Sequence, residues 1–291
     1  MQAYIAKASA AIIGVAFMTA VPAAADPFFF STGNPDGKIA TLSRPASPGK
    51  VETETADDFV TTAQTTQLTG ASFYGLIPTG TPLTDISQVE IEFYHVFPTD
   101  SANPPSGNVP TRVNSPSDVE IGSATRNSAS GTLGYSDSLI SASFTVLNTV
   151  VNGINPSPNQ FTGGEGGTTG EEVLITVNFT IPINLPADHY FFRPEVMLSD
   201  PGNFLWLSAP KPIVAPGTPF VPDLQTWIRN AQLSPDWLRI GTDITHQGPF
   251  NAAFSLTGQT IPEPASLSLL GAALAGIGII RLRRRRAWRR Q

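Results

Sequence analysis

The stretch VEIEFYHVF, residues 89–97, decides the fold class. Apolar and polar side chains alternate along it, and successive side chains of a β-strand point to opposite faces. A period of two therefore predicts a strand that is buried on one side. We expect its odd-numbered apolar residues on the buried face, and Glu90, Glu92 and Tyr94 on the other.

Similar alternation recurs on both sides of this stretch, and turn sequences such as Pro35-Asp36-Gly37 and Pro201-Gly202-Asn203 separate the segments. Many short strands joined by Gly- and Pro-rich turns predict an all-β fold. We expect an antiparallel two-sheet β-sandwich of jelly-roll type, with one short helix at Asp223–Asn230. The further expected strands are Lys38–Leu42, Ala56–Thr61, Gln67–Leu76, Val119–Thr125, Leu139–Leu147, Val173–Ile181, Tyr190–Leu198, Phe204–Ser208, Trp237–Ile240 and Phe250–Leu256.

The amino-acid composition of the chain excludes some kinds of site and partner. The chain has 291 residues and no cysteine, so disulfides and Cys-ligated metals are excluded. Between Asp26 and Ile261 there are nine basic residues against 22 acidic ones, a net charge of about −13. Such an acidic body repels phosphate backbones, so nucleic acid is not expected as a partner.

The N-terminus has the pattern of a secretory signal peptide, residues 1–25. Lys7 gives a modest positive region, an apolar segment follows it, and Ala23 and Ala25 fit the small-x-small rule for cleavage. We expect signal peptidase to cut before Asp26, after export through the secretory translocon. The alternative is an uncleaved N-terminal helix.

The C-terminus, residues 262–291, has three parts in sequence. Pro262-Glu263-Pro264 is stiff and extended, and Ala265–Ile280 follows with 16 uncharged residues. As a helix this segment spans roughly 24 Å, short of the ~30 Å hydrocarbon core of a bilayer. We expect it to cross the inner membrane in transit, with the arginines after it kept cytoplasmic by the positive-inside rule. These arginines are Arg281, Arg283, Arg284, Arg285 and Arg286.

This order of Pro262-Glu263-Pro264, short apolar helix and terminal arginines resembles the PEP-CTERM sorting signal. The resemblance covers residues 262–291 and leaves the body, 26–261, undescribed. It implies processing by an exosortase, a membrane protease-transpeptidase, and a place on the surface or in the extracellular matrix of a Gram-negative, exopolysaccharide-producing bacterium. The alternative is a simple tail anchor that is never processed. Both alternatives share the same topology.

Acidic side chains near turns are candidate ligands for Ca²⁺, which prefers hard oxygen ligands. Asp57 and Asp58 are adjacent, and Asn34 and Asp36 lie in a glycine-bounded turn. The alternative is that these side chains cap turns through their own backbone hydrogen bonds. No other cofactor is expected.

No catalytic constellation is evident, so we expect a non-enzymatic surface or matrix protein linked to exopolysaccharide and biofilm. One alternative is a carbohydrate-binding module, with Trp227 and Trp237 stacking on sugar rings while Trp206 is more consistent with the core. A second is a β-sandwich hydrolase that uses Glu90 and Glu92, whose Cα atoms lie ~7 Å apart on one strand face.

Overall fold

The computed structural model describes residues 25–98, 109–121, 126–128, 131–151, 162–199 and 202–262. Within it, Ala25–Pro262 forms one compact unit. Its elements are β1 (Asp26–Ser31), β2 (Ile39–Leu42), β3 (Thr53–Ile77), the 3₁₀ turn η1 (Leu83–Asp85), β4 (Ile86–His95), β5 (Arg126–Asn127), β6 (Leu133–Val146), β7 (Asn148–Val150), β8 (Thr168–Leu198), β9 (Leu205–Ala209), β10 (Trp227–Asn230), β11 (Leu238–Arg239), the π-helical turn η4 (Ile240–Ile244), β12 (Asn251–Ala252) and β13 (Phe254–Thr260).

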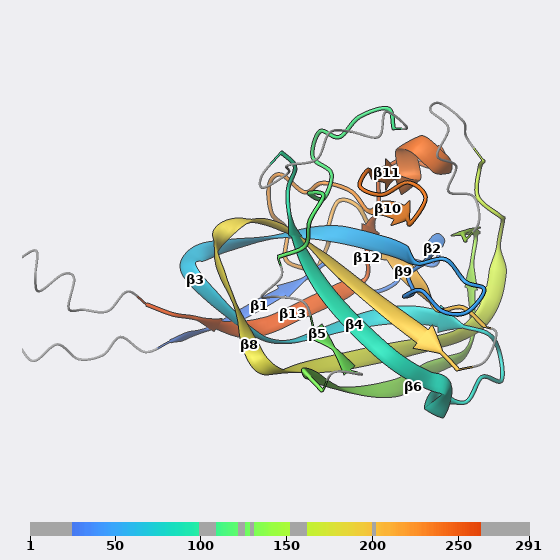
Figure 1. The fold of residues 1–291 in the computed structure, drawn as a ribbon, viewed down its shortest axis with the longest axis horizontal. Coiled ribbons are helices and arrows are strands. Elements are labelled where there is room, and N and C mark those ends of the chain that lie inside the picture. Colours follow the sequence, from blue (N-terminus) through green and yellow to red (C-terminus); the bar gives the residue numbers. More distant parts are fainter. Residues whose placement is uncertain are drawn as a thin grey trace, which may run out of the picture. The chain divides into compact units, whose positions relative to one another are not determined.

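Two long strands, β3 and β8, organise the sheet, and both bend sharply along their length (Figure 1). Each joins two segments that the sequence predicts as separate strands. They pair antiparallel with each other, and the register shifts between Thr61 and Thr65 and again between Leu68 and Gly70. Such irregularities bend a strand and increase its twist. The last part of β8 pairs with β4 and its first part with β6. The first part of β3 pairs with β10 and its last part with β13.

The prediction of an all-β fold is confirmed, but the strands form a single mixed sheet. Its main path is β5-β4-β8-β3-β9-β2-β7, and the described pairs are antiparallel except β2 with β7, which is parallel. The strands of both halves belong to one sheet because β3 and β8 run unbroken through them. The two-sheet sandwich and its jelly-roll topology stay predictions.

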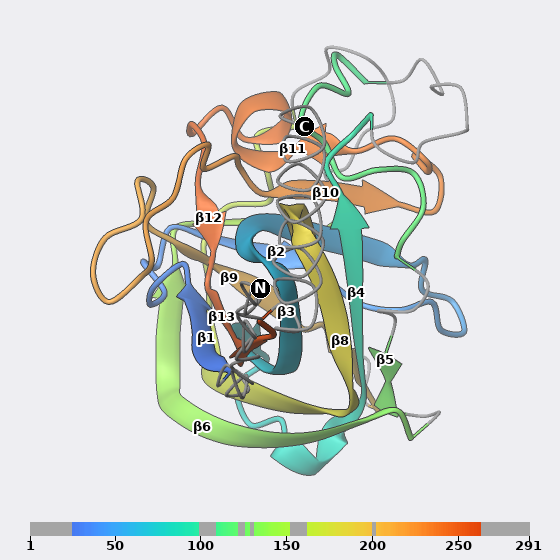
Figure 2. The ribbon, with the colours of Figure 1, turned by 90° about the vertical axis from the view of Figure 1, so that its left-hand side faces the viewer.

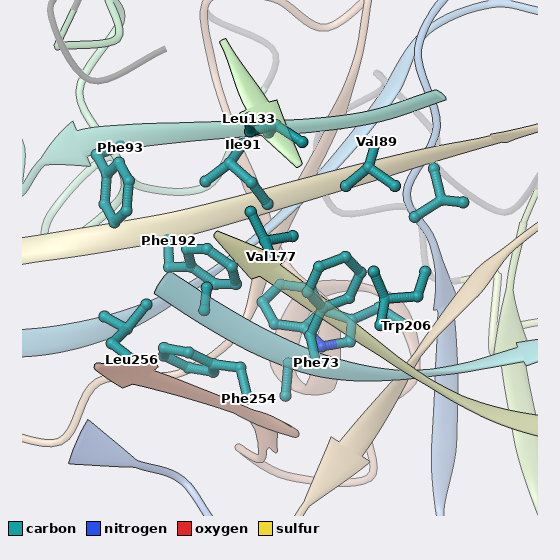
Figure 3. Packing of buried hydrophobic residues seen from close by; sticks show 14 of the residues in the cluster. Phe73, Val89, Ile91, Phe93, Leu133, Val177, Phe192, Trp206, Phe254 and Leu256 are labelled. Atoms are coloured by element: carbon teal, nitrogen blue, oxygen red, sulfur yellow. The ribbon is translucent and has the colours of Figure 1, made fainter. Parts of the chain in front are cut away.

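Aromatic rings fill the main core between the two halves. Phe192 of β8 lies 6.1 Å from Phe73 of β3 and 5.0 Å from Phe254 of β13, measured between ring centroids. Figure 3 shows these rings converging with Trp206 of β9. Gly75 lets β3 approach the core closely, because a Cβ atom there would lie 1.9 Å from the ring of Phe204.

A second layer covers the opposite face of β3, β4 and β8. There β10, β11 and η4 lie on the side away from β6 in both views (Figures 1 and 2). Strand β10 pairs antiparallel with the start of β3, through Trp227 opposite Ala56 and Asn230 opposite Thr53. On the face of β4 that the sequence predicts as polar, Glu92 and Tyr94 are buried and Glu90 is half-buried.

Two local predictions are wrong or only partly testable. Asp223–Asn230 forms no helix, because its last four residues are β10 and pair with β3. In Val119–Thr125 the first three residues are irregular, and the other four lie outside the described residues.

Candidate functional site

The second layer encloses a buried ionic cluster, formed by Glu54, Glu92, Tyr94, Arg193, Glu195 and Arg229. Strand alternation explains how it assembles. Even-numbered residues of β3 and β4 and odd-numbered residues of the last part of β8 share one face, because Glu92 lies directly opposite Arg193. Strand β10 pairs with β3 and adds Arg229, the cross-strand partner of Glu54. Every member of the ionic cluster is buried.

Arg193 is the centre of the ionic cluster, with 2% of its surface exposed. Its Nη1 atom lies 2.5 Å from Oε2 of Glu195, and its Nη2 atom lies 3.0 Å from Oε1 of Glu54. Nη2 also donates to Oε2 of Glu92. One guanidinium thus bridges carboxylates from three strands, a task for which its planar, multi-donor fork is suited.

Arg229 is the second guanidinium of the ionic cluster. Its Nη2 atom donates to Oε1 of Glu54 and to the hydroxyl of Tyr94, each at 3.1 Å, and its Nε atom donates to Oε2 of Glu54. The guanidinium lies 4.3 Å from the ring centre of Trp237, a cation–π contact. Tyr94 in turn donates its hydroxyl proton to Oε2 of Glu92, at 2.6 Å.

In the ionic cluster, burial raises the pKa of each carboxyl group and the arginines lower it, and the balance differs from one group to the next. Desolvation raises the pKa of Glu195 well above its usual value, despite the attraction of Arg193. The same cause raises the pKa of Glu92 to about 6, against the opposing effects of Arg193 and Tyr94. Burial opposes ionisation of Glu54 too, but Arg229 and Arg193 outweigh it and lower its pKa. The two arginines therefore favour the charged form of Glu54, which contacts both of them.

Asp57 and Asp58 do not converge on one point, since strand alternation sends adjacent residues of β3 to opposite faces. Asp57 accepts hydrogen bonds from the amide of Ala252 at 2.8 Å and from the hydroxyl of Thr226 at 3.2 Å. Oδ2 of Asp58 accepts from the amide of Leu224 at 3.0 Å and lies 2.7 Å from Nε2 of His189. The two carboxylates thus accept hydrogen bonds from chain segments outside β3. Their arrangement does not support a Ca²⁺ ion shared by both.

The other predicted calcium ligands are also engaged locally or exposed. Oδ1 of Asp36 accepts from the amide of Lys38 at 3.0 Å and from the hydroxyl of Ser208 at 2.5 Å. Asn34 is exposed. The turn-capping alternative describes Asp36 correctly. Among the described residues, the carboxylates whose oxygens converge are those of Glu52, Glu54 and Glu195, which sequence reasoning did not single out.

The tryptophans predicted as sugar contacts are core residues. Trp227 and Trp237 are each 1% exposed, and both belong to one buried apolar cluster with Tyr94, Phe191 and Ala56. Stacking on a sugar needs an exposed ring face, so this prediction is wrong for both. The sequence around them did not indicate burial, because β10 and β11, next to which they lie, are short strands without a clear alternation.

The two glutamates of the hydrolase alternative do share a strand face, as predicted. Glu92 is held by Arg193 and Tyr94 inside the ionic cluster, while Glu90 accepts a hydrogen bond from Nδ2 of Asn127 at 2.5 Å. A general acid or nucleophile must reach the substrate. Glu92 is 7% exposed and already bonded on one oxygen, which disfavours that role.

The ends of the compact unit meet at one place. Asp26, the predicted first residue after signal cleavage, begins β1 and lies directly opposite Thr260, the last residue of β13. The amide of Ile261 still donates to the carbonyl of Thr65, at 2.8 Å. The described part of the chain begins at Ala25 and ends at Pro262. Ala23, Glu263, Pro264, Arg281, Arg283, Arg284, Arg285 and Arg286 lie outside the described residues.

Comparison with known families identifies the segment that begins where β13 ends. The family described as the PEP-CTERM protein-sorting motif matches residues 260–286. The chain carries a PEP-CTERM sorting motif. This motif is characteristic of exported proteins sorted by an exosortase. No curated protein and no solved structure matches the chain.

The PEP-CTERM motif lies almost wholly beyond Pro262. Within the described part of the chain, no helix is both long and apolar enough to span a membrane. The predicted apolar segment Ala265–Ile280 lies outside that part, as does the predicted signal peptide up to residue 24.

Proposed function

We propose that this chain is a non-enzymatic surface or extracellular-matrix protein of a Gram-negative bacterium, secreted through the translocon and sorted at its C-terminus by an exosortase. The observation that carries the proposal is the sorting motif at residues 260–286, which starts at the last residue of the last strand. The motif therefore follows the body with no intervening domain, and the body is the part that sorting delivers.

The pairing of β1 with β13 supports this assignment. Asp26 and Thr260 are cross-strand partners, so the predicted signal-peptidase site and the sorting motif adjoin the body at the same edge. Processing at both positions would leave a body whose two ends are already hydrogen-bonded into the sheet. Trimming either targeting segment therefore removes no strand.

An association with exopolysaccharide or biofilm belongs to the same proposal and rests on the resemblance to exosortase substrates. The carbohydrate-binding alternative loses its main argument with the burial of Trp227 and Trp237. The hydrolase alternative loses its own with the engagement of Glu92 by Arg193. Neither is favoured by a specific observation.

The test compares three forms of the full chain in a host that has an exosortase. The first is unchanged, the second lacks residues 262–291, and the third carries Pro262→Ala, Glu263→Ala and Pro264→Ala with the rest of the tail intact. Cell fractionation and the mass of the mature C-terminus are measured. We expect the truncated form in the medium, and the triple variant unprocessed in the inner membrane.

The third form distinguishes an exosortase substrate from a simple tail anchor. A tail anchor predicts that the triple variant behaves as the unchanged chain does, with the full C-terminus retained in both. That result, or unchanged fractionation of the truncated form, would overturn the sorting proposal.

A further inference from the structure

Three neighbouring chain segments place a row of polar side chains on the face opposite to the ionic cluster. Arg44 forms an isolated antiparallel bridge with Thr53, the first residue of β3, and Thr53 is the cross-strand partner of Asn230, the last residue of β10. Directly opposite residues carry their side chains on the same face, with Cβ atoms about 4.5–5.5 Å apart. A guanidinium, a hydroxyl and a carboxamide therefore stand side by side. Glu54 and Arg229, the next residues inward on β3 and β10, point to the other face.

The side chains of this row line a pocket of about 280 Å³. Gln232 adds a second carboxamide to its wall, and the apolar part of the lining consists of Leu42, Val51 and Val151. The volume is just below the range of about 300–1,000 Å³ that is typical of sites for small ligands. The pocket therefore suits a ligand of one ring or smaller.

Arg44 differs from the other guanidiniums whose side chains the structure describes. Each of the others forms an ion pair with a carboxylate, and these are Arg112, Arg193, Arg229 and Arg239. Among the described residues, Arg44 donates only to neutral oxygens, Oδ1 of Asn203 at 2.5 Å and the carbonyl of Val51 at 3.4 Å. Partial burial lowers the pKa of Arg44, since no carboxylate offsets its loss of hydration. The pocket thus holds a positive charge without a counter-ion.

The unused hydrogen-bonding groups of the pocket are donors. A guanidinium has five N–H groups, and the bonds of Arg44 to Asn203 and Val51 use three of them. Oδ1 of Asn230 already accepts from the amides of Gln232 and Leu233, at 3.1 and 2.9 Å, which leaves its NH₂ group as a donor. A ligand that satisfies these groups must supply acceptor oxygens.

We propose that this pocket binds a small carboxylate, with Arg44 as its charged partner and Thr53 and Asn230 as neutral donors beside it. Hydrogen bonds from a guanidinium to a carboxylate are about twice as strong as neutral ones. One guanidinium matches one negative charge, whereas the body, with a net charge of about −13, disfavours a multiply charged ion such as phosphate. The carboxylate can belong to a free organic acid or to a sugar acid. This inference goes beyond the sorting proposal and does not depend on it.

The test is isothermal titration calorimetry on the full chain purified in detergent. Sodium glucuronate and sodium acetate are the two carboxylate probes, glucose is the neutral counterpart of glucuronate, and inorganic phosphate is the multiply charged probe. Each is titrated separately at the same ionic strength, because exposed charges are screened by salt.

Two variants change the pocket, and each has a matched control. Arg44→Gln removes the positive charge, and Lys38→Gln removes one from a side chain outside the pocket. Asn230→Asp places a carboxylate in the row beside Arg44 and keeps the oxygen that accepts from the turn after β10. Asn184→Asp makes the same charge change at an exposed position outside the pocket. The melting temperature of each variant, followed by circular dichroism, reports on the fold.

We expect saturable binding of both carboxylates, weaker binding of phosphate and none of glucose. Tighter binding of glucuronate than of acetate would assign the pocket to a sugar acid, and equal binding to a small free acid. Arg44→Gln and Asn230→Asp should each weaken carboxylate binding at least about tenfold, since each removes or neutralises a charge-assisted hydrogen bond. Lys38→Gln and Asn184→Asp should leave it nearly unchanged.

Three results would overturn the proposal. The first is the absence of saturable carboxylate binding at high millimolar concentration. The second is equal weakening by Arg44→Gln and Lys38→Gln, which would mean that the overall field attracts the anion. The third is glucose binding as tight as that of glucuronate. If Arg44→Gln does not fold, Asn230→Asp still tests the pocket, because it gives Arg44 a counter-ion: the melting temperature should not fall, and carboxylate binding should be lost.

Discussion

Phe192 and Arg193 are neighbours on β8, both almost fully buried, and they face two regions held together in opposite ways. Phe192 enters the main core, where it stacks on Phe254 at 5.0 Å. Arg193 enters the ionic cluster, where it bridges Glu92 and Glu195. The same strand therefore separates an apolar region from a charged one, one residue apart.

The comparison shows that burial alone does not tell what an interaction contributes. On the apolar face each buried Å² removed from water stabilises by about 25 cal/mol, whatever the pH. On the charged face, desolvation of the ions offsets most of their attraction, so an intact network can be nearly neutral while a broken one is costly. The two regions should respond differently to substitution and to pH, and that difference can be measured.

The largest expected effect is that of Arg193→Met. The substitution keeps much of the side-chain volume but leaves buried carboxylates of Glu54, Glu92 and Glu195 without their common partner. We expect a loss of about 3–5 kcal/mol in the free energy of unfolding at pH 7.5. Urea unfolding followed by circular dichroism measures it.

The loss caused by Arg193→Met should shrink at pH 5, since the freed carboxyl groups can then take up protons. Phe192→Leu is the matched control, because it perturbs the adjacent residue on the apolar face. Its cost should be equal at the two pH values. A pH-independent cost for Arg193→Met would contradict the ionic description of that face.

The apolar face could be predicted from the sequence, and the charged face could not. Alternation in residues 89–97 correctly put Val89, Ile91 and Phe93 in the core. It could not show that the face of Glu92 is covered, because the cover is β10, a four-residue strand some 130 residues further on. Pairing at that sequence separation leaves no local periodicity to detect.

Parts of the candidate site did leave a signal. Arg193 and Glu195 are two residues apart within the otherwise apolar stretch YFFRPEVML, residues 190–198, and charges at strand spacing in such a context indicate a buried ionic group. Alternation alone also predicts that Asp57 and Asp58 diverge. The sorting motif was the most predictable feature, because a linear motif does not depend on folding.

A smaller effect should follow from the pH dependence of Glu92. Its pKa is about 6 in the folded protein, raised mainly by burial, against a usual value of 4.5. Between these values the folded state holds more protons than the unfolded state, so stability falls as pH rises through this window. The upper limit is roughly 2 kcal/mol, since each pKa unit corresponds to ~1.4 kcal/mol.

Glu92→Gln isolates that contribution. The difference in unfolding free energy between the unchanged chain and Glu92→Gln, measured from pH 4 to pH 7.5, should decrease between about pH 4.5 and pH 6 and be flat on either side. Other buried carboxyl groups titrate in both proteins and largely cancel in the difference. A difference curve that rises with pH would mean that Arg193 outweighs burial at this position.

The smallest effect tests whether the two faces are independent. Ile91→Val removes one methylene from the main core beside Glu92, and should cost about 0.5–1.5 kcal/mol. The cost should be the same at pH 5 and pH 7.5, since neither side chain titrates. Because adjacent strand residues point to opposite faces, the double variant Ile91→Val, Glu92→Gln should be additive to within about 0.5 kcal/mol. A larger coupling energy would show that the sheet transmits strain from the ionic cluster to the core, and the two regions would then have to be treated as one.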